Sequence, residues 1–249
     1  MSRAVLVTGA SRGIGRAVAR AFAAQGDRVA VHFARDADAA AGTVATLPGT
    51  GHVVLQADLA VPAEARRLAD DAALALGGLD VLVNNAGVFL AHPPLTTGAP
   101  AWEQAWTDTI ALNLLGPAHL THAAVPHLMQ AGGGAVVNVS SRGAFRGEPD
   151  CPAYAASKAG LNALGQSLAI ALAPQGISVS TVSPGFVDTE MAAEVLGGPG
   201  GDAVRAQSPF GRVARPEEVA DAVVWLASPG ALFASGTIVD VNGASYLRS

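Results

Sequence analysis

Short apolar runs alternate along this chain with longer segments that have the residue pattern of helices. Each run is bounded by Gly, Pro, Asn or Asp, and most are rich in Val, Ile and Leu without a regular alternation of polar residues. This composition is typical of strands that are covered on both faces. Strands are therefore expected at residues 4–8, 28–33, 52–57, 81–84, 135–139, 178–182 and 237–241, and helices at residues 14–24, 62–76, 101–130, 153–173 and 216–227.

A strand, a helix and a further strand in repetition produce right-handed crossovers and a parallel sheet. Half of the 249 residues are hydrophobic and only 14% are charged, so a large core can form. The sequence shows neither a linker nor a drop in hydrophobicity. We predict a single α/β domain over residues 1–249, with a doubly wound, mainly parallel, seven-stranded sheet and helices on both of its faces.

The composition also restricts the partners of the protein. The net charge of −5 and the pI near 5.6 argue against nucleic-acid binding. The single cysteine, Cys151, excludes an intrachain disulfide, and His119 and His122 have no nearby acid or cysteine to complete a metal site. No apolar run approaches the ~18 residues of a membrane span, and the N-terminus leaves no room for a signal peptide. We expect a cytoplasmic protein without a metal or a membrane partner.

The first apolar run is followed by a glycine-rich turn. It reads Thr8-Gly9-Ala10-Ser11-Arg12-Gly13-Ile14-Gly15 and leads into an amphipathic segment. Glycines at such a junction let the backbone approach a pyrophosphate, and the N–H groups at the start of the helix favour its negative charge. A tight turn without a ligand is the alternative. The residues predicted to bind a nucleotide here are Gly9, Ser11, Arg12, Gly13, Ile14 and Gly15.

The end of the second run indicates which dinucleotide is bound. A free 2′-hydroxyl on the adenosine ribose usually pairs with an acidic residue at this place, whereas a 2′-phosphate requires a cation. Phe33 stands where the acid would be, and Arg35 and Arg12 are two guanidinium groups within reach of a phosphate. These residues favour NADP(H) over NAD(H). Asp36 keeps NAD(H) open, because a shift of a few residues would place this carboxylate on the ribose.

Tyr154 and Lys158 form a further pair of candidates. Lys158 is the only lysine of the chain, and it lies four positions after Tyr154, one of two tyrosines. On a helix the two side chains share a face. An ammonium group at that distance is expected to lower the pKa of the phenol from about 10, so that the tyrosine exchanges a proton near neutral pH. A surface Tyr–Lys pair without a function is the alternative.

Several motifs together identify a family. They are Thr8-Gly9-x-x-x-Gly13-x-Gly15, Asp58-Leu59, Asn84-Asn85-Ala86-Gly87, Asn113, Ser140-Ser141, Tyr154-x-x-x-Lys158 and Pro184-Gly185. With these motifs in this order and spacing, the chain resembles the short-chain dehydrogenases/reductases over nearly its whole length. It is similar in particular to bacterial 3-oxoacyl-(acyl-carrier-protein) reductases and ketone reductases. The resemblance implies a Rossmann-like fold and the NADPH-dependent reduction of a ketone to a secondary alcohol.

The resemblance also implies roles for single residues. Tyr154 would donate the proton, Ser141 would hydrogen-bond the substrate oxygen, and Lys158 would bind the nicotinamide ribose. Asn113 would hold a water molecule that links Lys158 to solvent. The cofactor contacts that it implies are Asp58 and Leu59 at the adenine, Val187 and Thr189 at the nicotinamide, and Asn85, Ala86, Gly87, Pro184 and Gly185. Asn84 and Asn85 are also expected to tie strands together through side-chain hydrogen bonds.

The substrate is expected to be a small ketone or the corresponding alcohol. An acidic carrier protein needs a basic surface on its reductase, yet residues 119–134 and 159–175 contain no Lys or Arg. Reduction of a 3-oxoacyl thioester on a carrier protein remains an alternative, as does a catalytically idle NADP-binding sensor. Basic and acidic residues near Tyr154 leave open whether the substrate is acidic. The basic pair is Arg142 and Arg146, and the acidic pair that would neutralise it is Glu148 and Asp150.

Two segments bear on the lid and on assembly. The connection over residues 189–212 is long for a compact domain, so a substrate lid is predicted there, with a variable surface loop as the alternative. The segment 159–173 is almost uncharged all round, which is typical of a helix buried on most faces. By resemblance, this segment and residues 101–130 would pair two copies into a homodimer, and dimers would pair further into a homotetramer.

Overall fold

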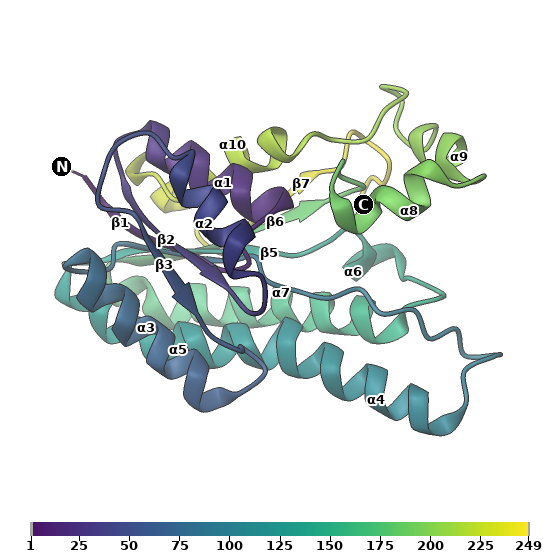
Figure 1. The fold of residues 1–249 in the computed structure, drawn as a ribbon, viewed down its shortest axis with the longest axis horizontal. Helices are drawn as coiled ribbons and strands as arrows, with labels where there is room; N and C mark the ends of the chain where they lie inside the picture. Colours follow the sequence, from purple (N-terminus) through teal and green to yellow (C-terminus); the bar gives the residue numbers. More distant parts are fainter. Residues whose placement is uncertain (1, 249) are drawn as a thin grey trace.

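The computed structural model describes residues 2–248, and all seven apolar runs are strands (Figure 1). Their bounds are Ala4–Val7 (β1), Arg28–Phe33 (β2), Val53–Gln56 (β3), Val81–Asn84 (β4), Gly134–Val139 (β5), Ile177–Pro184 (β6) and Ile238–Val241 (β7). The strands form one sheet in the order β3-β2-β1-β4-β5-β6-β7, and every neighbouring pair is parallel. The predicted fold class is confirmed.

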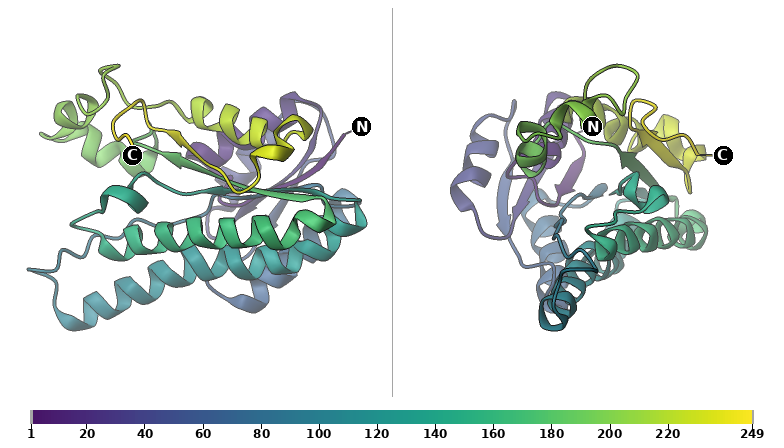
Figure 2. Two further views of the ribbon diagram at one scale, coloured as in Figure 1. Left: turned by 180° about the vertical axis from the view of Figure 1, so that it is seen from behind. Right: turned by 90° about the vertical axis from the view of Figure 1, so that its right-hand side faces the viewer.

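Helices cover both faces of the sheet, which explains why the central strands are apolar on both sides. Val5 and Val7 of β1 belong to one core cluster with residues of α1 and α10, whereas Leu6 belongs to a second cluster with residues of α3, α5 and α7. The two layers are visible above and below the sheet in Figures 1 and 2. The longer helices are Gly13–Ala24 (α1), Ala37–Ala45 (α2), Pro62–Leu76 (α3), Ala99–Ile110 (α4), Gly116–Gln130 (α5), Pro152–Leu172 (α7) and Pro216–Leu226 (α10).

Shorter helices complete the chain. They are the π-helical turn Ala111–Leu115 (η1), Gly143–Arg146 (α6), the 3₁₀ turn Ala173–Gln175 (η2), Glu190–Gly197 (α8), Gly201–Arg205 (α9) and the 3₁₀ turn Pro229–Ala234 (η3). None of the helices described between residues 2 and 248 combines the length and the apolar character that crossing a membrane requires.

The segment predicted as one helix over residues 101–130 is divided by η1. Asn113 lies in this π-helical turn, and its side-chain amide both accepts from the backbone N–H of Val88 (2.8 Å) and donates to the carbonyl of Val88 (2.9 Å). A π-turn keeps the chain helical and only shifts the side-chain pattern by about one residue, so the sequence pattern did not reveal the division. Helix α2 was also not predicted. Its alanine-rich sequence has only two buried positions, Ala40 and Thr43, and hence no clear apolar stripe.

The predicted lid, residues 189–212, contains helices α8 and α9 and extends away from the rest of the domain. Its two ends are joined where Asp188 donates its N–H to Ala214 (2.9 Å) and Ala214 donates to Phe186 (3.0 Å). Beyond this neck the segment projects past the carboxyl ends of the strands (Figure 2). The segment is thus a compact structure with helices of its own, held at a narrow base.

Candidate active site

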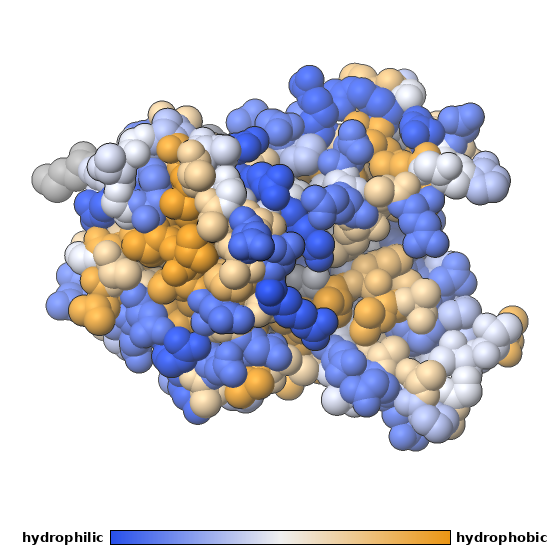
Figure 3. Space-filling view, in the orientation of Figure 1, coloured by the Kyte–Doolittle hydropathy of each residue, from blue (hydrophilic) through white to orange (hydrophobic). Residues whose placement is uncertain are grey.

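The strand order reverses between β1 and β4, and ligands of open α/β sheets bind at the carboxyl ends of the strands at such a point. A cavity of about 610 Å³ lies there. The surface is visibly hollowed at this place, with hydrophilic residues on one rim and apolar residues on the other (Figure 3). The predicted site residues that line the cavity are Gly9, Ser11, Arg12, Gly13, Ile14, Gly15, Arg35, Asp58, Leu59, Asn85, Ala86, Gly87, Ser141, Tyr154, Lys158, Pro184, Gly185, Val187 and Thr189.

The glycine-rich turn is packed too closely for side chains. Gly9 and Gly13 have φ values of 61° and 53°, a region that favours glycine. A Cβ on Gly15 would lie 2.3 Å from the carbonyl oxygen of Gly9. Asn85 holds the turn against β4, because its side-chain amide donates to the carbonyls of Thr8 (2.8 Å) and Gly9 (3.2 Å). The expectation that Asn85 ties strand ends together is confirmed.

The first turn of α1 has N–H groups available for an anion. Arg12 occupies the N-cap position, and its side chain makes no capping hydrogen bond. Backbone N–H groups at a helix start, together with the helix dipole, favour a phosphate. The geometry of this turn therefore fits the pyrophosphate of a dinucleotide.

His32 on β2 is a member of the site that sequence reasoning missed. Its side chain is 2% exposed, its Nδ1 accepts from the N–H of Gly9 (3.1 Å), and its Nε2 lies 3.0 Å from the carbonyl oxygen of Ala57. These partners require a neutral imidazole with the proton on Nε2. Burial lowers the pKa of His32 to about 4, against smaller opposing effects of Ala57 and Asp58. The imidazole thus connects the ends of β1, β2 and β3.

Two residues at the end of β2 bear on the choice of dinucleotide. Both Arg35 and Asp36 line the cavity. The carboxylate of Asp36 accepts from the N–H of Ala39 (2.9 Å) and so caps α2. Arg35 forms no ion pair with any residue between 2 and 248. The cation is therefore available to a ligand, whereas the carboxylate already has a partner within the protein.

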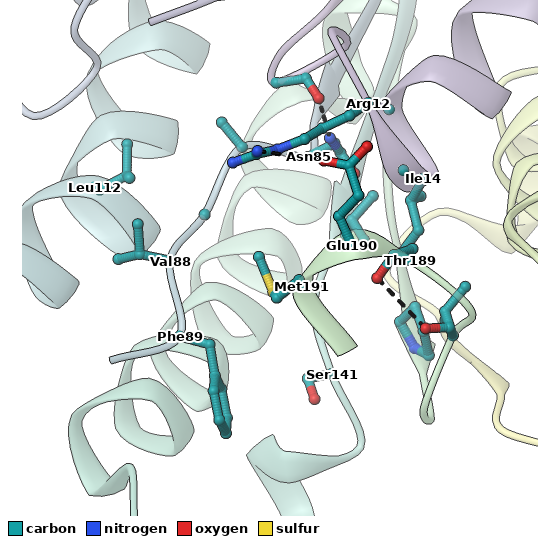
Figure 4. Close-up of a pocket in the computed structure, with 18 of the residues that line it drawn as sticks. Arg12, Ile14, Asn85, Val88, Phe89, Leu112, Ser141, Thr189, Glu190 and Met191 are labelled. Atoms are coloured by element: carbon teal, nitrogen blue, oxygen red, sulfur yellow. Dashed lines mark hydrogen bonds and ion pairs between the residues drawn. The ribbon is translucent and has the colours of Figure 1, made fainter. Parts of the chain in front are cut away.

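The lid and the glycine-rich turn meet across the cavity. Arg12 lies 3.4 Å from the carboxylate of Glu190 on α8, and both side chains are 64% exposed. Figure 4 shows this pair spanning one part of the cavity, with Met191 and Phe89 at the other. Thr189 lies beside the turn as well, since a Cβ on Gly13 would be 3.3 Å from its methyl group.

Ser141, Tyr154 and Lys158 line the same cavity and lie close to one another. Lys158 is 4% exposed, and its ammonium donates to the carbonyl of Val139 (2.8 Å) and lies 5.8 Å from the centre of the Tyr154 ring. The Ser141 hydroxyl oxygen accepts from the N–H of Gly143 (3.0 Å) and lowers the pKa of Tyr154 by hydrogen bonding. The neighbouring Ser140 instead donates to the backbone of Lys158 (3.2 Å). This difference supports Ser141 as the serine of the site.

The prediction that Lys158 lowers the pKa of Tyr154 is wrong for this structure. Burial raises the pKa of Tyr154 to about 12, and the Ser141 hydrogen bond opposes this only in part. Burial also lowers the pKa of Lys158 to about 8. Removal from water disfavours each charged form, and the ammonium is directed to Val139 rather than to the phenol oxygen.

Asn113 is fully buried behind the cavity and is not part of the described wall. In addition to its two bonds with Val88, its amide donates to the hydroxyl of Ser157 (3.2 Å). A Cβ on Gly87 would lie 3.1 Å from the Asn113 oxygen and 3.5 Å from the Lys158 ammonium. The residue is therefore adjacent to Lys158, but both polar atoms of its side chain already have protein partners.

Apolar side chains form a wall that the sequence reasoning did not assign. Phe89 packs edge-on against the Tyr154 ring with a centroid distance of 4.8 Å. Met191 and Val195 on α8 are 62% and 43% exposed and line the cavity together with Leu112. Two signals in the sequence could have indicated them: an apolar segment directly after the Asn-Asn-Ala-Gly motif, and exposed apolar residues in a lid.

Comparisons with known proteins agree with this geometry. A family model described as enoyl-(acyl carrier protein) reductase matches residues 9–244. The chain is 40% identical, over 97% of its length and 95% of the relative, to a protein assigned as ketoacyl reductase 2 of the granaticin polyketide synthase in Streptomyces violaceoruber. It is equally similar, with the same coverage, to cis-4-hydroxycyclohexanecarboxylate dehydrogenase of Sinomonas cyclohexanicum. It is 34% identical, over 99% of both chains, to a 3-oxoacyl-(acyl-carrier-protein) reductase of Staphylococcus aureus.

Proposed function

The chain belongs to the short-chain dehydrogenase/reductase family of oxidoreductases, and on this premise we propose that it reduces a ketone to a secondary alcohol with NADPH. One observation carries the proposal. A single cavity has the glycine-rich turn in one part of its wall and Ser141, Tyr154 and Lys158 in another. A dinucleotide bound along it would bring its reactive ring to the one place where a proton donor and a hydrogen-bonding hydroxyl meet.

The cofactor fits the residues present. The N–H groups at the start of α1 would hold the pyrophosphate, Asp58 and Leu59 the adenine, and Val187 and Thr189 the nicotinamide amide. When bound, NADPH supplies the hydride. NADPH is favoured over NADH because Arg35 forms no ion pair within the described residues 2–248 and Arg12 has only an exposed ion pair, which is weak.

The raised pKa of Tyr154 suits a donor in the reductive direction. A phenol with a pKa of about 12 keeps its proton at neutral pH and releases it only as the substrate oxygen becomes strongly basic. Ser141, with its oxygen fixed by the N–H of Gly143, would turn its hydroxyl proton from the Tyr154 oxygen to the substrate oxygen. Lys158 would bind the cofactor ribose. Asn113 would act mainly by placing Val88 and by supporting the helix turn beside Lys158.

A free ketone is the favoured substrate. Phe89 packs on the Tyr154 ring and Met191 lines the same cavity, so apolar surface is available for the hydrocarbon body of a small ketone. A 3-oxoacyl thioester is the second candidate, because a relative at 34% identity is named as a 3-oxoacyl-(acyl-carrier-protein) reductase. Comparing a 3-oxo ester with its carrier-protein thioester at equal concentration distinguishes the two.

The proposal is tested by Tyr154→Phe. The loss of the phenol hydroxyl is expected to lower kcat by about 100-fold or more, because no other group replaces the proton, while the NADPH dissociation constant stays within about threefold. Oxidation of NADPH would be followed by absorbance against a panel of ketones. Tyr246→Phe is the matched control and should retain wild-type turnover.

Full turnover by Tyr154→Phe would refute the donor role. If the wild-type protein binds NADPH but reduces no ketone and oxidises no alcohol in the panel, the idle sensor becomes the better explanation.

A further inference from the structure

Arg142, the residue after Ser141, is a buried cation whose hydrogen-bond partners are neutral. Its side chain is 3% exposed, and between residues 2 and 248 it forms no ion pair with a carboxylate. One terminal nitrogen donates to the hydroxyl of Ser245 (2.6 Å) and the other to the amide oxygen of Gln207 (2.5 Å). The guanidinium also lies over the Phe186 ring, 5.1 Å from its centre.

These partners come from three distant parts of the chain. Gln207 lies near the end of the lid, Ser245 lies in the C-terminal tail, and Phe186 is at the lid neck. Figure 1 shows the C-terminal tail returning to the base of the lid beside α6. The planar fork of an arginine can hold two acceptors and stack on a ring at once, which a lysine cannot do.

The tail is also held independently of Arg142. Ser208, itself a lid residue, makes a second contact between lid and tail by donating its hydroxyl to the carbonyl of Gly243 (2.7 Å). Arg248 forms an ion pair with Asp240 (2.7 Å) and lies 4.4 Å from the centre of the Phe145 ring on α6. Loss of the Arg142 contacts should therefore loosen the lid without releasing the whole C-terminus.

The charges around Arg142 do not neutralise it by direct contact. Arg146 donates to the same oxygen of Gln207 (3.2 Å), so one neutral amide oxygen accepts hydrogen bonds from two guanidinium groups. Burial, and then Arg146, lower the pKa of Arg142, whereas Glu148 raises it. Burial of a cation without a carboxylate contact disfavours the folded state, so the position of Arg142 is better explained by the arrangement that its hydrogen bonds fix.

We propose that Arg142 is a positioning residue that fastens the lid and the C-terminal tail to the serine loop and thereby sets the substrate pocket. The lid brings Met191 and Val195 to the apolar wall. Its first residues, Thr189 and Glu190, lie against the glycine-rich turn, but they directly follow the neck hydrogen bond of Asp188, whereas Arg142 holds the far end of the lid at Gln207. Arg142 should therefore affect ketone binding far more than NADPH binding. The predicted effect on the KM for the ketone rests on the proposed ketone reduction. The predicted effect on how firmly the lid is held does not depend on that function.

The first test uses Arg142→Met and Arg142→Lys in the full chain. Both remove the bidentate fork, so each is expected to raise the KM for the ketone by about tenfold with a smaller change in kcat and an NADPH dissociation constant within about twofold. Arg146→Met is the matched comparison. It removes an exposed arginine that shares Gln207, and its KM is expected to change by less than about threefold.

The second test measures how often the lid opens, by its rate of cleavage with trypsin. Arg205 and Arg212 lie in the lid with side chains 42% and 50% exposed. Trypsin should cleave at these residues at least about fivefold faster in Arg142→Met than in the wild type, because a less firmly held segment opens more often. Gln207→Glu places a carboxylate on the buried guanidinium, so cleavage should become slower than in the wild type.

The outcomes separate this inference from the proposed function. Faster cleavage in Arg142→Met and slower cleavage in Gln207→Glu support the fastening role even if no ketone is reduced. Unchanged lid cleavage in a folded Arg142→Met protein overturns it. An equal loss of ketone and NADPH binding overturns it as well, because that pattern indicates general damage to the fold. Restoration of the wild-type KM by Arg142→Lys would show that charge alone is required and would also contradict the role of the fork.

Discussion

Tyr154 and Lys158 are each stabilised in the neutral form by burial. The phenol therefore retains its proton, and the ammonium loses its charge as the pH rises through about 8. The i,i+4 spacing indicated that the two side chains share a helix face. It did not indicate that the Lys158 ammonium donates to Val139. At the scale of residues, the proximity of Tyr154 and Lys158 was predictable from the sequence. The direction of the Tyr154 pKa shift was not, because it depends on the burial of the phenol.

Arg12 and Arg35 provide a prediction about cofactor choice. Arg12→Ala and Arg35→Ala are each expected to weaken NADPH binding about tenfold or more, because each would remove a proposed charge-assisted bond to the 2′-phosphate. NADH binding should change by less than about threefold. Dissociation constants for both cofactors can be measured by fluorescence titration.

The control for this prediction is Arg20→Ala. Arg20 lies on α1 and donates to Thr46, away from the cavity wall. Its removal should alter neither cofactor. Equal losses for NADPH and NADH in the two cavity variants would contradict the phosphate assignment.

His32 should make the protein less stable in acid. Its pKa is about 4 in the folded protein, below the ordinary value of 6.5. Between these values the unfolded chain binds a proton that the folded protein does not. Stability is therefore complete above about pH 6.5 and falls as the pH decreases toward 4, by up to about 3 kcal/mol. Urea unfolding at pH 7 and pH 4.5 measures this difference.

The variant His32→Gln cannot take up this proton and should show a smaller loss between the two pH values. His122→Gln changes an exposed histidine of α5 and should keep the wild-type loss. If the loss in His32→Gln matched that of the wild type, the acid sensitivity would have to come from other groups.

At the scale of elements, alanine substitutions at two helical glycines are predicted to change the stability of the protein in opposite directions. A Cβ at Gly15 in α1 would meet the Gly9 oxygen at 2.3 Å, whereas a Cβ at Gly42 in α2 has no atom within 4 Å. Gly15→Ala is expected to destabilise the protein by about 1–3 kcal/mol and to weaken NADPH binding. Gly42→Ala is expected to stabilise it by about 0.5–1 kcal/mol.

Urea unfolding of both glycine variants decides this prediction, with the wild type as reference. Stability of Gly15→Ala equal to that of the wild type would mean that the turn and α1 can move apart without cost. That outcome would contradict the close packing on which the predicted phosphate site depends.

The strands and helices also show which elements sequence patterns locate and which they miss. The strands were located closely because each is a short, continuous apolar run between turn residues. The division of residues 101–130 was missed because it depends on the hydrogen bonds of Asn113 to Val88, which is 25 positions away. Helix α2 was missed because it is rich in alanine and has only two buried positions, Ala40 and Thr43.

At the scale of the whole molecule, exposed apolar side chains on α5, α7 and η1 bear on the proposed self-association. Ile170 is 81% exposed, and Leu115 and Met129 are each 46% exposed. Ile170→Asp is expected to shift the proposed homodimer or homotetramer toward a monomer, because it places a charge where an apolar side chain would be buried. Sedimentation velocity at micromolar protein measures the shift.

Leu74→Asp is the matched control. Leu74 on α3 is 84% exposed, and its substitution should leave the sedimentation coefficient unchanged. A wild-type protein that sediments as a monomer at high concentration would refute the proposed assembly.

The amino-acid sequence by itself determined the order of the strands, most of the long helices, the parallel sheet and the motif residues of the cavity wall. These features follow from local spacing: apolar runs, turn residues, and motifs at the carboxyl ends of strands. Only the tertiary structure decided the partners of His32 and Arg142, the separation of Asn113 from the cavity, and the pKa of Tyr154. Each of these depends on burial and on contacts between residues far apart in the chain, such as Arg142 and Ser245, and no local pattern encodes such contacts.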